Sequence, residues 1–209
     1  LDMNSNPLLI EEHQPQGRQL LSKDIRADLC IVGGGLAGLC SAITAARQGL
    51  DVTLVHDRPV LGGNSSSEVR LWVLGATSHM GNNNRWAREG GVCGELMEEN
   101  LWRNPTGNPL VWDSLLLEKA MAEPNLTLLL NTSCMGCQLS EPGTIKAVLS
   151  YCSQNETHYQ IEASNYIDSS GDGVLAFSAG APFRMGAEGE DAFNEGFAPD
   201  EEFGALLGL

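Results

Sequence analysis

Three glycines in the first part of the chain have a spacing that suits phosphate binding. Gly33, Gly35 and Gly38 form a G-x-G-x-x-G pattern directly after the apolar run Leu29–Val32. In this pattern the first glycine permits a tight turn, the second lets the backbone approach a pyrophosphate, and the third lets a helix pack close to its strand. The helix N-terminus offers unpaired N–H groups and a favourable dipole to an anion. The pattern therefore predicts a dinucleotide site if a strand precedes it and a helix follows.

Two further loops have residue types that could line the same site. Gly62, Gly63 and Asn64 form a second glycine loop, and Asp168 precedes a glycine turn over residues 169–173. Asp168 lies at the predicted C-terminal end of a strand, which is the edge of an α/β sheet where ligands bind. We expect this carboxylate to cap the turn that follows it.

Residues 79–91 hold the candidate catalytic side chains. His79 could transfer a proton near neutral pH, and Arg88 could bind an anionic group. Arg85 and Glu89 lie in the same segment and are further candidates. A structural role for His79 is the alternative, because loop histidines more often serve as hydrogen-bonded structural residues than as catalysts.

The composition excludes several classes of protein. The formal net charge is −15, so we expect no nucleic-acid partner, because such binders need a basic face. The Cys134-x-x-Cys137 pair falls short of the roughly four ligands of a zinc or iron–sulfur site, so we expect no metal. No apolar run approaches the roughly 20 residues that span a membrane. A serine hydrolase is excluded because the chain has no G-x-S-x-G elbow.

The elements that would position these residues follow a regular order. A strand over 28–32, a helix over 36–48 and a strand over 52–55 make one βαβ unit. Apolar residues at helical spacing then predict two helices, and a third strand follows them. Beyond that point, short apolar runs between turn sequences predict a β-meander of three strands, over 134–139, 145–152 and 157–163, followed by a short strand over 166–168 and a helix over 174–179.

This order of elements resembles that of the glutathione-reductase-like FAD fold. The motifs over 57–68 and 167–173 are similar to those of the FAD-dependent oxidoreductase family related to the flavoprotein subunit of heterodisulfide reductase. The resemblance covers about residues 25–200. It implies an α/β fold, a Rossmann-like FAD-binding domain with a parallel sheet plus a three-stranded β-meander, whose final strand we expect to be missing.

The same resemblance implies FAD as cofactor and hydride transfer with a small-molecule substrate. It also implies contacts to each part of FAD, which fall on the glycine loops and on the start of the meander. These are Gly33, Gly35, Ala37 and Gly38 for the pyrophosphate; Gly62, Gly63 and Asn64 for the phosphates or the flavin edge; Cys134 for the adenine, through backbone atoms; and Gly171 and Asp172 for the ribityl chain.

One position departs from the family pattern. The second strand of such proteins usually ends in an acid that accepts hydrogen bonds from the adenosine ribose, but His56 falls at that position here. Either Asp57 reaches the ribose from the next position, or His56 replaces the acid. We expect Asp57 to do so, with Arg58 available for the phosphates. An ion pair of Asp57 and Arg58 on the loop surface is the alternative.

The domain prediction has three parts. We expect a lead-in segment over 1–24, the FAD-binding domain over 25–181, and the acidic start of an incomplete substrate or cap region over 182–209. We expect the chain to be an N-terminal part of a longer protein, with an electron-transfer partner or a second copy as further partners. An NAD(P)-binding Rossmann oxidoreductase and a non-catalytic scaffold with the FAD fold are the alternative functions. Both a cytoplasmic location and export after removal of a leader remain open.

Overall fold

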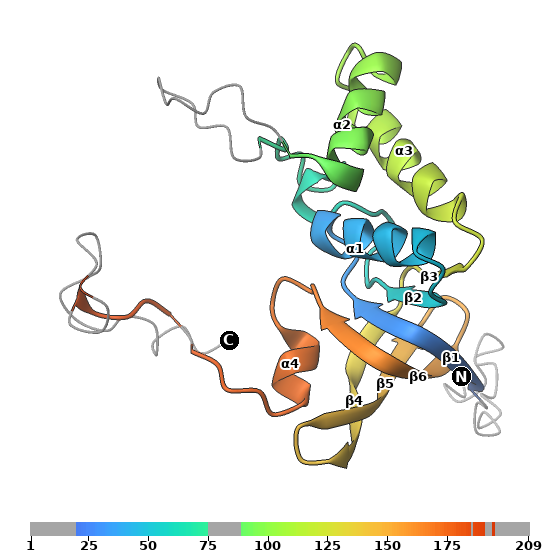
Figure 1. The fold of residues 1–209 in the computed structure, drawn as a ribbon, viewed down its shortest axis with the longest axis vertical. Helices are drawn as coiled ribbons and strands as arrows, with labels where there is room; N and C mark the ends of the chain where they lie inside the picture. Colours follow the sequence, from blue (N-terminus) through green and yellow to red (C-terminus); the bar gives the residue numbers. More distant parts are fainter. Residues whose placement is uncertain (1–19, 75–88, 185, 191–193, 195–209) are drawn as a thin grey trace, which may run out of the picture.

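The centre of the molecule is a six-stranded sheet, seen in a computed structural model that describes residues 20–74, 89–184, 186–190 and 194 (Figure 1). The strand order is β3-β2-β1-β6-β5-β4. The first four of these strands run parallel, whereas β6, β5 and β4 pair antiparallel. The strands are β1 (Leu21–Val32), β2 (Val52–Val55), β3 (Leu126–Leu129), β4 (Ser133–Glu141), β5 (Thr144–Cys152) and β6 (Thr157–Asp168).

The helices cover the two faces of the sheet unequally. Three of them, α1 (Leu36–Arg47), α2 (Gly91–Arg103) and α3 (Pro109–Met121), gather on one side, and the short α4 (Val174–Ser178) lies on the other, beside β4 and β6 (Figure 1). Local sequence explains where α3 begins. The Asn108 side chain accepts a hydrogen bond from the Leu110 N–H, and Pro109 occupies the first helical position, where its missing N–H costs nothing.

A separate hydrophobic cluster lies on each face of the sheet. Ile31 and Leu54 pack against Leu39 of α1 and Leu116 of α3 on the helical side. On the opposite side Cys30, Val32 and Val55 pack with Ile161 of β6 and Leu175 of α4. Because the C-terminal part of β1 and the whole of β2 are buried on both faces, Leu29–Val32 is continuously apolar and Val52–Val55 contains one polar residue, the buried Thr53.

The predicted α/β fold, with a parallel sheet and a meander, is confirmed, but two strands differ from the prediction. β1 begins at Leu21 and not near Asp28, and β6 is one continuous strand where two were predicted, over 157–163 and 166–168. The cause is the parallel pairing of β1 with β6, which extends from Leu21 opposite Thr157 to Val32 opposite Asp168. The first eight residues of β1 are mostly exposed and their few apolar residues are scattered among polar ones, so this part of the sequence gives only a weak hydrophobic signal. As a result the meander and the parallel sheet share β6.

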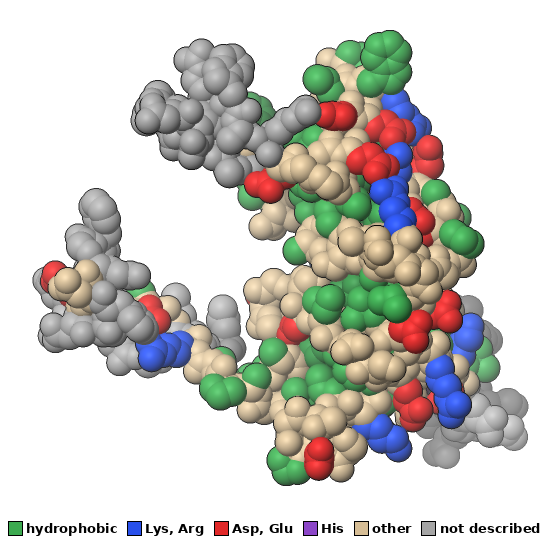
Figure 2. Space-filling model, in the orientation of Figure 1, with side chains coloured by type: hydrophobic (Ala, Val, Ile, Leu, Met, Phe, Trp, Pro, Cys, Tyr) green, Lys and Arg blue, Asp and Glu red, His purple; other side chains and the backbone are tan. Residues whose placement is uncertain are grey.

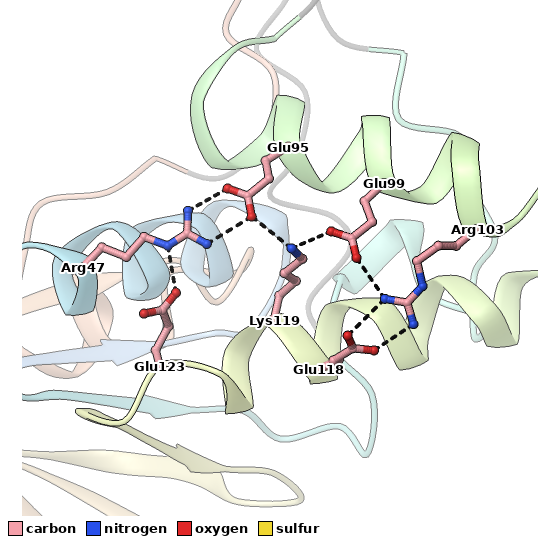
Figure 3. A network of polar contacts seen from close by, with 7 residues as sticks. All are labelled: Arg47, Glu95, Glu99, Arg103, Glu118, Lys119 and Glu123. Carbon is pink, nitrogen blue, oxygen red and sulfur yellow. Dashed lines mark hydrogen bonds and ion pairs between the residues drawn. The ribbon is translucent and has the colours of Figure 1, made fainter.

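A chain of alternating charges fastens the three helices to one another. Arg47 at the end of α1 contacts Glu123 and makes two hydrogen bonds to Glu95 of α2. Lys119 of α3 then bridges Glu95 and Glu99. Arg103 of α2 completes the series by pairing with Glu99 and with Glu118 of α3 (Figure 3). We call these seven residues the charge ladder, and Figure 2 shows acidic and basic side chains gathered over these helices.

The ladder perturbs the ionisation of its members. The hydrogen bonds from Arg47 are the largest cause that lowers the pKa of Glu95, to about 2. The Lys119 and Arg103 hydrogen bonds lower the pKa of Glu99 in the same way. Both carboxylates are therefore ionised and paired at neutral pH.

No helix of the part of the chain that the structure describes is both long and apolar enough to cross a membrane.

Candidate functional site

A cavity of about 740 Å³ lies where β1, β2 and β6 end. Its volume is within the range of roughly 300–1,000 Å³ that is usual for small-molecule and cofactor sites. The cavity brings together the candidate cofactor residues from four separate parts of the chain, with one exception. The candidates that line it are Gly33, Gly35, Ala37, Asp57, Arg58, Gly62, Gly63, Asn64, Cys134, Gly171 and Asp172.

Gly38 is the exception, because it lies behind the first glycine loop and does not line the cavity. A Cβ at Gly38 would lie 1.8 Å from the Gly33 carbonyl oxygen, and one at Gly33 would lie 2.3 Å from the Ser169 carbonyl oxygen. Gly33 also has a φ of +104°, which a residue with a side chain rarely adopts. These two glycines let α1, β1 and the end of β6 approach one another, and so fix the shape of the loop.

Gly35 has a different environment from its two neighbours in the motif. It is the N-cap residue of α1, with an extended backbone at φ −62°, and no side chain caps the helix. The first turn of α1 contains no acidic residue. A Cβ at Gly35 would meet no protein atom nearer than 4.0 Å, so it would occupy cavity space. Unpaired N–H groups at an open helix N-terminus form a ready anion site.

The second glycine loop lies directly against the first. The Gly62 N–H donates a hydrogen bond of 2.9 Å to the Gly34 carbonyl, and Gly35 and Gly62 form an isolated parallel bridge. A Cβ at Gly63 would lie 3.1 Å from the Gly35 Cα. The two loops therefore form one backbone cradle, which we define as residues 33–37 with 62–64.

α3 holds the second loop in place through two side chains. The Trp112 indole N–H donates to the Ser65 hydroxyl at 3.1 Å, and the Ser67 N–H donates to Asp113 Oδ1 at 2.9 Å. Asp113 is only 8% exposed. Sequence reasoning missed this role, since the partners lie 46 and 47 positions apart. The available signal was an aspartate within the apolar face of α3.

His56 joins the two loops from beneath. Its Nδ1 accepts a hydrogen bond from the Gly34 N–H at 3.0 Å, and its Nε2 lies 2.9 Å from the Val60 carbonyl oxygen. Nδ1 must be unprotonated to accept, so the ring is the neutral tautomer with its proton on Nε2. Burial lowers the pKa of His56, against the opposing effects of Val60 and of the Asp57 charge. With both nitrogens engaged, His56 has no atom left for a ribose.

Asp57 and Arg58, which follow His56, differ in how far they are engaged. The Asp57 side chain is 63% exposed and lies at the wall of the cavity. Arg58 makes two hydrogen bonds of 2.9 Å to Glu68, which lower the pKa of that carboxyl. Arg58 therefore pairs with Glu68, and the Asp57 carboxylate remains an acceptor at the cavity.

The turn after β6 forms another wall of the cavity. Asp168 accepts hydrogen bonds from the Ser170 N–H and hydroxyl and from the Ala176 N–H. Burial acts to raise its pKa, but these hydrogen bonds outweigh burial and lower it. Asp168 thus fixes the turn and α4, while Gly171 and Asp172 line the cavity.

Cys134 at the start of β4 lines the cavity from the adjacent strand. Burial raises the pKa of its thiol.

The cavity also has an apolar wall that sequence reasoning did not identify. Val69, Leu71, Trp72, Val73 and Leu74 contribute to it, and Trp72 is 86% exposed. A ligand that fits both walls would carry a charged part at the cradle and a flat apolar part near Trp72.

Of the four catalytic candidates, only Glu89 lies among the residues that the structure describes. His79, Arg85 and Arg88 lie outside the described residues. Glu89 is described, and it lines a second cavity of about 450 Å³ beside α2. Val73 and Leu74 line both cavities, so the two share a wall.

Solved structures with a similar fold include a FAD-dependent halogenase. The myxobacterial chondrochloren halogenase CndH, a FAD-dependent halogenase, has a TM-score of 0.54 at 14% identity, over 78% of this chain and 41% of that one. Thermovibrio ammonificans THI4 has a TM-score of 0.50 at 15% identity, over 78% of this chain and 66% of that one. The L-proline dehydrogenase from P. horikoshii has a TM-score of 0.43 at 17% identity, over 73% of this chain and 24% of that one.

The chain thus spans between 24% and 66% of the length of these three proteins. At such identities the first two show that the fold is shared and nothing more. No curated protein sequence matches the chain. The family profile of FAD dependent oxidoreductases matches residues 28–205, which is most of the chain and contains every cofactor candidate. The chain therefore belongs to the FAD-dependent oxidoreductase family, and FAD is the cofactor that this family indicates.

Proposed function

We propose that this chain is the FAD-binding part of an oxidoreductase that exchanges a hydride with a small-molecule substrate. Bound FAD supplies the redox chemistry, and the protein supplies orientation and electrostatics. We also propose the predicted division into a lead-in over 1–24, the FAD-binding domain over 25–181 and the start of a substrate or cap region over 182–209, with the first boundary moved to Leu21, where β1 begins.

The cradle suits the diphosphate of FAD. The diphosphate would lie on the N–H groups of residues 35–37, at the positive end of the α1 dipole, with Gly62, Gly63 and Asn64 along its other side. What supports this proposal is the open space at Gly35, where the protein atom nearest to a built Cβ is the Gly63 Cα, 4.0 Å away. A diphosphate that close to the backbone needs this opening.

The remaining walls suit the two ends of the cofactor. Asp57 would accept hydrogen bonds from the adenosine ribose hydroxyls, because its carboxylate is exposed at the cavity while His56 is fully engaged. Backbone atoms at Cys134 would contact the adenine, and Gly171 and Asp172 would lie beside the ribityl chain.

The apolar wall suits the flavin ring. Trp72 offers an exposed aromatic surface for stacking, and the second cavity, which shares Val73 and Leu74 with the first, offers a route for the substrate. His79 and Arg88 remain our candidates for proton transfer and for binding an anionic substrate group.

A matched pair of glycine variants tests this function. Gly35→Ala places a Cβ in the cavity, whereas Gly90→Ala makes the same change at the N-cap of α2, where the backbone is also extended and a Cβ meets nothing within 4 Å. Both variants lose an N-cap glycine, so the free energy of unfolding should fall by a similar amount in each, up to about 1 kcal/mol. We expect Gly35→Ala to weaken FAD binding about tenfold or more, measured by flavin fluorescence titration, and Gly90→Ala to bind as the wild type does.

Equal FAD affinity in both variants would contradict a diphosphate site at Gly35. A wild-type protein that binds NADH but not FAD would favour the NAD(P)-binding alternative. Bound FAD that no electron donor reduces would favour the non-catalytic scaffold.

A further inference from the structure

His56 occupies a place where a proton would change two contacts of the cradle at once. The side chain is 6% exposed and packs against Gly34, where a built Cβ would be 2.7 Å from the imidazole Cγ. Its Nδ1 accepts from the Gly34 N–H, and its Nε2 contacts the Val60 carbonyl. The neutral ring therefore ties the first glycine loop to the segment that leads into the second.

A proton on Nδ1 would remove the acceptor that Gly34 uses. The Nδ1–H and the Gly34 N–H would then face each other as two donors, and the amide would lose its partner. Asp57 Oδ1 lies 3.5 Å from Nδ1 and would accept the new proton. Of the other charged groups that act on His56, Glu68 favours the protonated form and Arg58 opposes it. These two pair with each other, so Asp57 is the partner nearest to the proton.

The same Asp57 carboxylate is the group that the proposed function assigns to the adenosine ribose. We propose that His56 is a positioning residue that makes FAD binding depend on its own protonation: neutral His56 holds Gly34 and leaves Asp57 free for the ribose, whereas protonated His56 releases Gly34 and pairs with Asp57. This inference rests on the proposed function, because it needs FAD in the cradle.

The direction of the pH effect follows from this competition. Only the neutral form has the intact cradle, so FAD binding displaces a proton, and the dissociation constant rises as the pH falls. Burial lowers the pKa of His56 from its ordinary value of 6.5, so the dependence lies on the acid side of 6.5. Below the pKa of the free protein the dissociation constant for FAD rises by up to about tenfold per pH unit, the slope of one proton.

Two histidine variants test the proposal by fluorescence titration of FAD between about pH 8 and about pH 5. His56→Asn keeps an oxygen near the position of Nδ1, where it accepts from Gly34, but it does not titrate. His158→Asn is the matched control, since His158 is exposed on β6 and stacks on Tyr151 away from the cavity. We expect the wild type and His158→Asn to show the slope of one proton, and His56→Asn to bind FAD with little change across the range.

A measurement on the ligand-free wild type makes the test independent of how the variants fold. We expect the His56 ring and the Gly34 amide to shift together in an NMR pH titration, with a midpoint below 6.5. An amide that stays fixed while His56 titrates would overturn the proposal, as would a His56→Asn protein with the same slope as the wild type. Both results leave tight binding of FAD at neutral pH intact, whereas loss of that binding in the wild type would overturn the proposed function and this inference together.

Discussion

The cradle at the N-terminus of α1 and the charge ladder that begins at the last residue of α1, Arg47, are held in opposite ways. The cradle is built from backbone in close contact, and a Cβ at Gly33 would lie 2.3 Å from the Ser169 carbonyl oxygen. The ladder is built from long side chains on the helix surface, such as Arg47 and Glu95, which are 37% and 38% exposed. The structure of the cradle is maintained by close steric packing, whereas the ladder is maintained by ion pairs between solvent-exposed side chains.

This difference predicts how each region responds to change. Steric exclusion in the cradle cannot be relieved by a shift of side-chain rotamer, so single substitutions there have large effects on fold and binding. An exposed ion pair is worth about 0–1 kcal/mol and weakens with salt, so the ladder tolerates the loss of one member. In our proposal the cradle determines what the protein binds, whereas the ladder determines only how strongly α1, α2 and α3 are held together.

Gly38→Ala should have the largest effect. The new Cβ would collide with the Gly33 carbonyl oxygen and with Ser169 Oγ. Relief of this collision requires α1 to move away from β1 and β6. We expect a loss of about 3 kcal/mol in the free energy of unfolding, together with loss of FAD binding. Denaturant unfolding and FAD titration measure both quantities. If this variant were as stable as the wild type, the loop would not be closely packed, and the contrast between a sterically packed cradle and an ion-paired ladder would be wrong.

Asp57→Asn should have the next largest effect, on binding alone. The variant removes the charge that accepts from the ribose, which is worth about 1.5–3 kcal/mol, so FAD affinity should fall about tenfold to a hundredfold. The exposed side chain predicts an unchanged melting temperature. Asp24→Asn, on the exposed outer half of β1, is the control. Unchanged FAD affinity in Asp57→Asn would assign the ribose to another residue.

Arg47→Met should have a smaller effect, on stability alone. Methionine keeps much of the apolar stem but releases Glu95 and Glu123 at once, so we expect a loss of about 1 kcal/mol with FAD affinity unchanged. The loss should shrink in about 1 M salt, where charges are screened within about 3 Å. Arg26→Met, at an 89% exposed position, is the control and should have no effect. A large change in FAD affinity would mean that ladder and cradle are coupled.

Glu95→Gln should have the smallest effect, a change in how protein stability depends on pH under acidic conditions. The pKa of Glu95 is lowered in the folded protein to about 2 from 4.5, chiefly by Arg47, so its contribution is complete above 4.5. That contribution is lost as the pH falls from about 4.5 to about 2. We therefore expect the wild type to lose more stability than Glu95→Gln over this range in thermal unfolding. Equal slopes would show that Glu95 is not held by the ladder.

Local patterns in the sequence were sufficient to predict individual helices and strands but not which strands pair with one another. β2 was predicted at its observed bounds, and α2 and α3 contain the residues whose helical spacing predicted them. The continuity of β6 was missed because Ser164 and Asn165 interrupt the apolar run, and only pairing with β1 reveals one strand.

The candidate site shows the same limit. The glycines were recognisable from the sequence because the turn between β1 and α1 requires residues without a side chain at fixed positions. The roles of His56, Trp112 and Asp113 depend on contacts with distant loops, which no spacing encodes. That His56 falls at the position of the usual acid was visible in the sequence, but its hydrogen bond to the Gly34 N–H was not.

The central claim is that the backbone cradle holds FAD, and amide shift mapping by NMR tests it most directly. Titration of FAD into the labelled protein should shift the amide signals of residues 35–37 and 62–64 most strongly, with smaller shifts near Cys134 and Gly171. Signals of residues 97–107, beside the second cavity, should change little. Shifts concentrated at residues 97–107, with the cradle amides unmoved, would contradict the account.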